Sequence, residues 1–225
     1  MNDHTALRTA YLAAADRVAT ILQDSDEDTL AARVAACPDW TVHHLGAHLA
    51  GAVTDFLDGR MDGAPGPVWS ARHVAERRDL TGGELATQLT SGARRLAPEV
   101  FASPSPTPVW DLLVHEGDLR EALRLPVQPE QVSSTLLPVV VAFLAMIGKP
   151  EGGITISTTE RRWTIGDGQT EARIDGDDYA LLRILFSRRS TAQIEKSTSG
   201  DVAVVASLGS FGPRDDDQPV PAPAA

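Results

Sequence analysis

Apolar residues recur at helical spacing through the first two-thirds of the chain. The first run places Leu7, Tyr11, Val18 and Leu22 on one stripe, and residues that return every three or four positions in this way predict an amphipathic helix. The same reasoning predicts helices over residues 7–22, 27–36, 41–59, 83–101, 109–124 and 129–148. The proline-rich stretch 103–108 is expected to form an extended loop, because proline cannot continue a helix.

The pattern changes near residue 150, where a proline and two glycines follow the last long helix. Apolar and polar residues then alternate, as in a half-buried strand, over residues 154–158 and 163–165. A third strand is expected over residues 172–174 and a last one around Ile194, with a helix capped by Asp177 and a closing helix over residues 202–208. We therefore expect an α+β protein, with an all-helical domain over residues 1–149, a small α+β domain over residues 150–211 and a disordered tail over residues 212–225.

The composition is that of an ordinary globular protein, with 42% hydrophobic and 23% charged residues in a chain of 225. The net charge of −11 repels phosphate groups, and the densest basic spots are pairs such as Arg77-Arg78, so a nucleic-acid partner is not expected. The single cysteine, Cys37, excludes an internal disulfide and a zinc cage made of thiolates. We interpret it as a small buried apolar residue.

Two features of the chain bear on its location. The N-terminal residues lack a basic segment followed by an apolar block, which is the pattern of a secretory signal. The longest apolar run, residues 136–147, is shorter than the ~20 residues that cross a bilayer. These observations predict a cytoplasmic protein that has no membrane partner.

The helix expected over residues 109–124 carries a candidate metal site. Asp111 and His115 are four residues apart, so both lie on one helix face beside its apolar stripe. One metal ion can bind such a pair, although an ion pair between the two side chains explains the same spacing more simply. His48 lies on the flank of the apolar face of the 41–59 helix, and it is the natural third ligand if the two helices pack together. The other histidines are interpreted as surface residues: His4, His43, His44 and His73.

The two segments that contain these residues resemble signatures of the mycothiol-dependent maleylpyruvate isomerase family, which belongs to the wider group of DinB-like four-helix bundles. The segments are CPDWTVHHLGAHLAG, residues 37–51, and WDLLVHEGDLREAL, residues 110–123. Residues 174–182 and 187–190 are similar to the small C-terminal domain of that family, which is itself like a sterol-carrier fold. The resemblance covers roughly residues 5 to 210.

The resemblance implies a divalent metal ion, with zinc the expected one, held by His48, Asp111 and His115. It further implies mycothiol as the thiol cofactor or co-substrate. Asp118, three residues after His115, is interpreted as a group that orients one of the ligands, with a plain surface acid as the alternative. A small molecule is the expected substrate.

The chemistry of this ligand set agrees with the use of a thiol. Two histidines and one carboxylate leave a position open, and a thiol that binds there loses its proton and becomes a nucleophile. In an isomerase the thiolate would add to a cis double bond conjugated with a carbonyl, let the remaining single bond rotate and then leave. In a transferase the thiolate would attack an electrophile and stay attached to it. Arg188 and Arg189 are candidates to bind a substrate carboxylate, because arginine pairs with that group through two hydrogen bonds.

Two other functions are left open by the residues. A non-catalytic module would carry a lipid or another apolar small molecule in the small domain. Its metal would be absent or structural, with His44 or Asp118 as a fourth ligand. A metal-dependent hydrolase would hold water at the open position. Metal content tests the first alternative, and activity in the absence of any thiol would favour the second.

Overall fold

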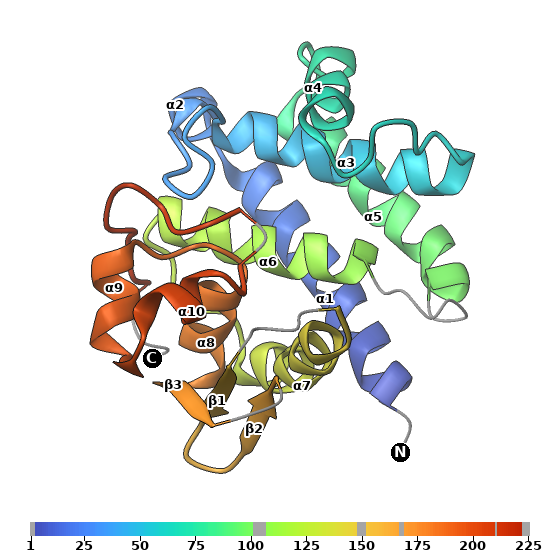
Figure 1. Ribbon diagram of the computed structural model, residues 1–225. Coiled ribbons are helices and arrows are strands. Elements are labelled where there is room, and N and C mark those ends of the chain that lie inside the picture. The colour runs from blue at the N-terminus through green and yellow to red at the C-terminus, as the bar shows by residue number, and fades with distance from the viewer. Residues whose placement is uncertain (1–2, 101–106, 148–151, 167–168, 210, 222–225) are drawn as a thin grey trace. The chain divides into compact units, whose positions relative to one another are not determined.

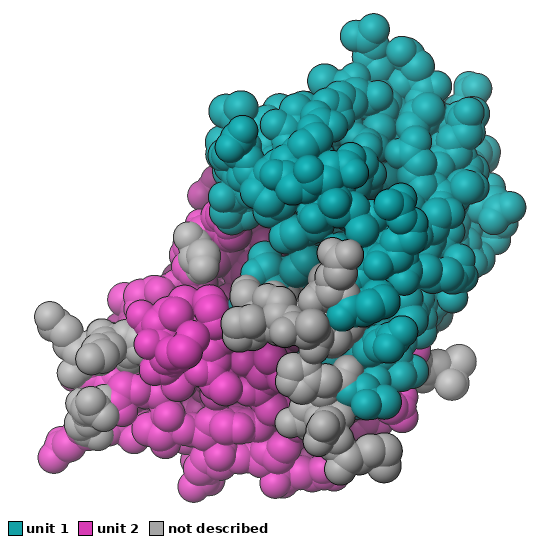
Figure 2. Space-filling model, turned by 90° about the vertical axis from the view of Figure 1, so that its right-hand side faces the viewer, with its two compact units in different colours: residues 1–128, 220–225 teal, residues 129–219 magenta. Residues whose placement is uncertain are grey.

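The computed structural model describes residues 3–100, 107–147, 152–166, 169–209 and 211–221 (Figure 1). The loop expected over residues 103–108 falls largely outside these ranges. The chain forms two compact units, coloured separately in Figure 2. Unit 1 comprises residues 1–128 and 220–225, and unit 2 comprises residues 129–219. The described part of unit 1 is helical and unit 2 combines helices with a small sheet, so the predicted α+β class is confirmed.

Unit 1 is built around four long helices. They are α1 (Asp3–Asp24), α3 (Val42–Asp58), α5 (Gly82–Val100) and α6 (Thr107–Ala122), and the short helices α2 (Glu27–Ala31) and α4 (Pro67–Glu76) lie between them in the chain. α1 and α3 each pack against both α5 and α6 (Figure 1). Their apolar stripes meet in a core that buries Tyr11, Leu45, Leu89 and Leu113. The helical bundle expected from the sequence is therefore present.

Both ends of α3 follow from its sequence. The Thr41 hydroxyl accepts a hydrogen bond from the backbone N–H of His44, and His44 Nδ1 accepts one from the backbone N–H of Thr41. This reciprocal pair is a capping box, which satisfies donors that the first helical turn leaves unpaired. Gly59 ends the helix with a φ of 70°, a left-handed conformation that glycine adopts without strain.

A buried glutamate holds α6 against α1. Glu116 is fully buried, and its carboxylate oxygens accept hydrogen bonds from Nε and Nη2 of Arg17, each at 2.7 Å. Arg120 Nε and Gln128 Nε2 donate to the same carboxylate at 2.9 and 3.0 Å. A buried charge is tolerated when it is paired and hydrogen-bonded in this way. The cluster therefore fixes the position of the helix that carries two of the three candidate ligands.

Unit 2 contains a four-stranded sheet in the order β2-β1-β3-β4. Its strands are β1 (Gly153–Ser157), β2 (Arg162–Ile165), β3 (Thr170–Asp175) and β4 (Thr198–Gly200), and its helices are α7 (Glu130–Ile147), α8 (Asp178–Leu185), α9 (Thr191–Lys196) and α10 (Val202–Ala206). β1 pairs antiparallel with β2 and parallel with β3, and β3 pairs antiparallel with β4. All residues of β1 are buried. The strands predicted near residues 154, 163 and 172 are confirmed.

The boundary between the units differs from the predicted one at residue 150. The change of pattern there places α7 at the end of the helical domain, but α7 packs against α8 and β2 and belongs to unit 2. Arg161 Nη1, in the turn before β2, donates to the backbone carbonyl of Ser134 in α7 at 2.9 Å. An apolar stripe shows that a helix is buried, but it does not show which domain supplies the partner.

Two further expectations for unit 2 differ from the structure. Ile194 lies in α9 and not in a strand, because Ser190 and Gln193 form a capping box that begins this helix. Part of the tail expected to be disordered, residues 212–225, lies against α9. Gln193 Nε2 donates to the backbone carbonyl of Gln218 at 2.7 Å, and Gln193 Oε1 accepts from the backbone N–H of Gln218 at 2.9 Å. These polar contacts hold a segment that has little apolar surface to bury.

α7 is long and apolar enough, by length and composition alone, to cross a membrane. The core helix of a protein that never enters a membrane passes the same test, and α7 buries Val132, Leu136 and Leu144 within the protein. The expectation of no membrane partner therefore stays a prediction.

We predict that Glu116→Ala lowers the free energy of unfolding by about 3 kcal/mol or more, because loss of one partner leaves the other buried charges uncompensated. Urea denaturation followed by circular dichroism measures the change. Asp16→Ala is the matched control. Asp16 lies on α1, next to Arg17 in the sequence, and pairs with Arg94 at 2.7 Å, but both of these side chains are exposed, so a loss below about 1 kcal/mol is expected. Equal losses in the two variants would contradict the role of Glu116.

Candidate metal centre

Three potential metal ligands meet between α3 and α6. His48 comes from α3, and Asp111 and His115 come from successive turns of α6. His48 Nε2 lies 3.4 Å from Asp111 Oδ2, His115 Nε2 lies 3.5 Å from Asp111 Oδ1, and one ligand atom from each residue falls within 4.8 Å of the others. Two ligand atoms about 2.1 Å from a tetrahedral zinc ion lie about 3.4 Å apart. The structure brings the three predicted residues together, and their donor atoms fit one divalent cation.

The surroundings of these residues are largely closed to water. His48 and His115 are 4% and 7% exposed, and Asp111 is half-buried. The ring of Trp40 covers part of both imidazoles, with centroid distances of 4.9 Å to His48 and 6.2 Å to His115. Burial, and after it the negative charge of Asp111, raises the pKa of Tyr11 well above its usual range. Charge interactions are stronger in such an environment than in water, which favours the binding of a cation beside the carboxylate.

Asp118 contacts the second ring nitrogen of His115. Its Oδ2 is buried and lies 2.8 Å from His115 Nδ1. A carboxylate at this position holds the hydrogen on Nδ1 and leaves the lone pair of Nε2 for a metal ion. Asp118 is therefore placed to orient His115, as the resemblance implies.

Cys37 is half-buried beside α6, and its thiol donates to Asp118 Oδ2 at 3.8 Å. The interpretation as a small buried apolar residue is incomplete, because Cys37 is only half-buried and the loop before α3 places its thiol next to a buried carboxylate. Cys37, His115 and Asp118 also lie close enough together to share an ion. The hydrogen bond between His115 Nδ1 and Asp118 already uses the nitrogen on that side of the ring.

His48 has a buried partner in α4. His73 is fully buried, its Nδ1 lies 3.2 Å from His48 Nδ1, and its Nε2 lies 2.9 Å from Asp55 Oδ2. The prediction that His73 is a surface residue is wrong, because α4 turns this side chain toward α3. Burial is the largest of the effects that lower the pKa of His73, so the ring is neutral at neutral pH.

Asp55 is an ionised acceptor at the far end of these contacts. Burial alone raises its pKa, but hydrogen bonds from His73 and Arg72 outweigh burial and hold the pKa below its ordinary value. Arg60 adds an ion pair, with 3.6 Å between its Nε and Asp55 Oδ1. A carboxylate with two cationic neighbours accepts hydrogen bonds and donates none.

α4 approaches α3 closely at Gly51. A Cβ atom added there would lie 2.4 Å from Cγ and 2.5 Å from Cβ of His73, which is well inside van der Waals contact. Trp69, one turn before His73, packs its ring against the same imidazole at a centroid distance of 4.3 Å. The imidazole therefore fits against α3 because Gly51 has no side chain.

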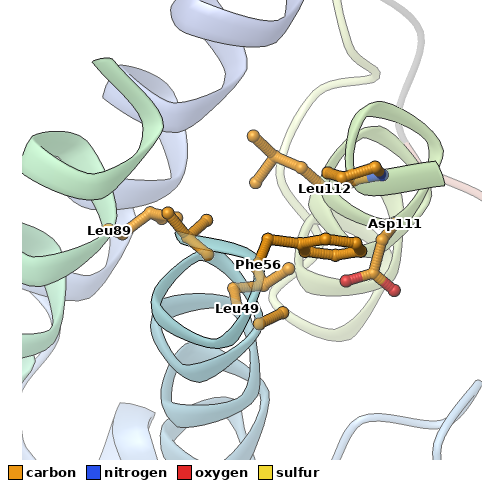
Figure 3. A pocket seen from close by; sticks show the side chains of 8 residues that line it. Leu49, Phe56, Leu89, Asp111 and Leu112 are labelled. Carbon is orange, nitrogen blue, oxygen red and sulfur yellow. The ribbon is translucent and has the colours of Figure 1, made fainter. Parts of the chain in front are cut away.

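A small hollow opens beside Asp111 (Figure 3). Its volume is about 210 Å³, counting the part that is open to solvent. Apart from Asp111 its lining is apolar, and the labelled side chains of Leu49, Phe56, Leu89 and Leu112 surround it in Figure 3.

The histidines predicted to lie on the surface differ in their placement. His43 is half-buried, with its Nε2 2.8 Å from the backbone carbonyl of Leu80. His44 is half-buried and caps α3. The side chain of His4 lies outside the described residues.

Arg188 and Arg189 belong to unit 2, directly after α8, and both are buried. Arg188 Nη1 donates to the backbone carbonyl of Phe186 at 2.7 Å, and Arg189 Nη1 donates to that of Arg188 at 2.6 Å. Their proposed contact with a substrate carboxylate stays a prediction.

A family model described as the mycothiol maleylpyruvate isomerase N-terminal domain matches residues 11–128, which include all three potential ligands and make up more than half of the chain. The chain belongs to this family. No curated protein matches the chain. A crystal structure of mycothiol-dependent maleylpyruvate isomerase is similar over 83% of this chain and 88% of that chain, with a TM-score of 0.55 and 17% sequence identity. A crystal structure of a histidine-to-alanine mutant of mycothiol-dependent maleylpyruvate isomerase has the same coverage, a TM-score of 0.50 and 16% identity. At these identities the likeness shows a shared fold.

The match to the mycothiol maleylpyruvate isomerase N-terminal domain confirms the resemblance that the sequence suggests. It ends at residue 128, where unit 1 also ends along the continuous chain. The family domain therefore contains α3, α4 and α6, and α7 lies beyond it.

In this family member, sequence reasoning misses α4 and with it His73. Two signals of α4 are present in the sequence. Pro67 stands at the first helical position after Gly66, and Trp69 and His73 are one turn apart. A stripe of two residues is too short for periodicity to reveal, and the glycines and prolines before it indicate a turn instead.

We predict that Gly51→Ala lowers the free energy of unfolding by about 1–3 kcal/mol, because the new methyl group overlaps the ring of His73 in a tightly packed region. Gly83→Ala is the control, since Gly83 lies in α5 and a Cβ there meets nothing within 4 Å. It should be neutral or stabilising by up to about 1 kcal/mol. Urea denaturation compares the two variants. A Gly51→Ala protein as stable as the wild type would show that His73 moves away from α3 at no cost.

Proposed function

We propose that this chain is an enzyme that uses a divalent metal ion, preferably zinc, and a low-molecular-weight thiol, mycothiol, to isomerise a maleylpyruvate-like acid. The observation that carries the proposal is the convergence of His48, Asp111 and His115 within the matched family domain. The two similar solved structures, of mycothiol-dependent maleylpyruvate isomerase and of its histidine-to-alanine mutant, support the choice of thiol and substrate class.

The residues of the centre would have two roles, which are to bind the metal ion and to orient its ligands. His48 and His115 would bind the ion through Nε2 and Asp111 through a carboxylate oxygen, which leaves one tetrahedral position open. When bound, the ion lowers the pKa of a thiol at that position, so that the thiol ionises at neutral pH. Asp118 holds the ring of His115 in the orientation that this requires. Trp40 covers the imidazoles and limits the access of water.

The nucleophile of this proposal is the external thiolate. When bound, the thiol would supply a sulfur nucleophile that adds to one carbon of the cis double bond while the π electrons move toward the conjugated carbonyl. Rotation about the remaining single bond and loss of the same thiolate would give the trans product, with no atom gained or lost. Arg188 or Arg189 is proposed to bind a carboxylate of the substrate.

Cys37 has no part in this reaction. Its thiol donates to Asp118, on the Nδ1 side of His115, whereas the proposed ligand atoms face Asp111. The chemistry therefore needs no cysteine from the chain.

Transfer of the thiol to an uncharged electrophile is a second candidate. Apart from Asp111 the side chains that line the hollow are apolar, which favours contact with an apolar part of a substrate over contact with a carboxylate. In this reaction the sulfur stays bonded to the electrophilic carbon, and a leaving group departs with the electron pair.

The partners in this proposal are the thiol and a small-molecule substrate. A cytoplasmic location is part of it, because low-molecular-weight thiols stay reduced there. A nucleic acid is not a proposed partner, since the chain carries a net charge of −11.

We predict that the purified protein holds about one zinc ion per chain, as a three-ligand catalytic site requires. His48→Ala, Asp111→Asn and His115→Ala should each lose the ion and the mycothiol-dependent isomerisation of maleylpyruvate. His43→Ala should keep both, because His43 lies on α3 but contacts Leu80. Elemental analysis gives the metal content, and ultraviolet absorbance follows the isomerisation. A chelator should abolish the activity, and added zinc should restore it.

The same assay separates the alternatives. Consumption of one thiol for each product would identify thiol transfer, whereas turnover without thiol would favour a hydrolase. A folded wild-type protein that cannot be loaded with zinc would refute the proposed function and favour a non-catalytic module.

A further inference from the structure

A chain of hydrogen bonds leads away from the metal centre on the Nδ1 side of His48. His48 Nδ1 lies 3.2 Å from His73 Nδ1, and His73 Nε2 lies 2.9 Å from Asp55 Oδ2. All three side chains are buried, with exposed fractions of 4% for His48 and 0% for His73 and Asp55. Each nitrogen in the chain must therefore act as a donor or an acceptor, since water does not replace a missing partner there.

The direction of these hydrogen bonds is set from the Asp55 end. Asp55 also accepts a hydrogen bond from Arg72 and forms an ion pair with Arg60, so its oxygens act only as acceptors. His73 Nε2 must therefore carry the hydrogen in its contact with Asp55. Asp55 is already paired with two arginines, so a positive charge on the fully buried ring of His73 would lack a further carboxylate to compensate it, and the ring is neutral. Its other nitrogen, Nδ1, is then an acceptor, and His48 Nδ1 must be the donor toward it.

A histidine that binds a metal through Nε2 requires this same hydrogen-bond direction, with Nδ1 as the donor. A histidine that binds a metal through Nε2 keeps its hydrogen on Nδ1, and a hydrogen-bond acceptor at Nδ1 fixes both the tautomer and the ring orientation. His48 Nε2 already faces Asp111 at 3.4 Å.

We propose that His73 is a positioning residue that holds His48 in its Nδ1–H tautomer, so that the Nε2 lone pair is directed toward Asp111 and a metal ion. The part of this inference that concerns a metal rests on the proposed function. The part that concerns the tautomer of His48 does not, because it follows from hydrogen bonds within the metal-free chain.

The packing of α4 is suited to this role. The ring of His73 packs directly against the backbone of α3, because Gly51 has no Cβ and an added one would lie only 2.4 Å from Cγ of His73. Trp69 packs against His73 and His48, at ring-centroid distances of 4.3 and 5.7 Å. The acceptor nitrogen is thus held at a fixed distance from His48, whereas His115 has a carboxylate, Asp118, directly at the same position of its ring.

The tautomer of His48 in the full-length, metal-free protein is the direct test. Nitrogen NMR at mildly alkaline pH distinguishes an imidazole that carries its hydrogen on Nδ1 from one that carries it on Nε2. We expect a hydrogen on His48 Nδ1, with a scalar coupling across the hydrogen bond to His73 Nδ1. A ring that carries its only hydrogen on Nε2, where Asp111 is the competing acceptor at 3.4 Å, would overturn the inference. This measurement needs neither a variant nor a metal.

Zinc affinity is the second readout, measured by competition with a chromophoric chelator. His73→Leu removes the acceptor and should raise the zinc Kd by about 10–100-fold. His73→Asn keeps an acceptor oxygen close to the position of Nδ1 and should recover most of that loss. His43→Leu makes the matching change on α3, outside the hydrogen-bonded chain, and should leave the Kd unchanged. Urea denaturation confirms that each variant is folded.

Equal zinc affinity of the wild type and His73→Leu would overturn the inference, and so would an asparagine variant that binds no better than the leucine variant. A wild-type protein that binds no zinc would refute the proposed function instead. The tautomer of His48 would then decide the inference alone.

Discussion

The whole centre depends on one constraint: both nitrogens of a buried imidazole need a hydrogen-bond partner or a metal ion. The ring has two nitrogens, and in the dry interior of a helical bundle both need a partner. Asp118 lies at one nitrogen of His115 and His73 at one nitrogen of His48, and in both rings the other nitrogen faces Asp111. Side chains outside the centre therefore determine which nitrogens point into it. The ligand geometry is a consequence of hydrogen-bond satisfaction around the ligands.

The fold supplies these partners at fixed positions. α6 is buried along most of its length, and Glu116 holds it against α1 through two hydrogen bonds from Arg17. α3 begins at a capping box, so the turn that carries His48 is set by the start of the helix. α4 approaches α3 closely at Gly51, where no side chain separates the two helices. The contacts that stabilise the bundle are thus the contacts that position the ligands. A loss of packing at one of these contacts would displace the ligand side chains.

The centre could be predicted from the sequence where its geometry belongs to a single helix. Asp111, His115 and Asp118 are related by spacings of four and three residues, so α6 alone places them on one side. His48 could be found from its place beside an apolar stripe. His73 could not, because its contact with His48 depends on how a short helix packs and no local pattern records that. The same limit applies to α7, whose stripe predicts burial but not the unit that buries it.

The charges around the centre bear on the substrate. A divalent ion would be balanced by the carboxylates of Asp111 and Asp118, and a bound thiolate would then leave the centre negative. A substrate with two carboxylates is repelled by such a centre unless a cation compensates its charge. An uncharged electrophile needs no such cation. Isomerisation and thiol transfer use the same nucleophile, so loss of a metal ligand would stop both reactions, and the charge of the accepted substrate is what distinguishes them.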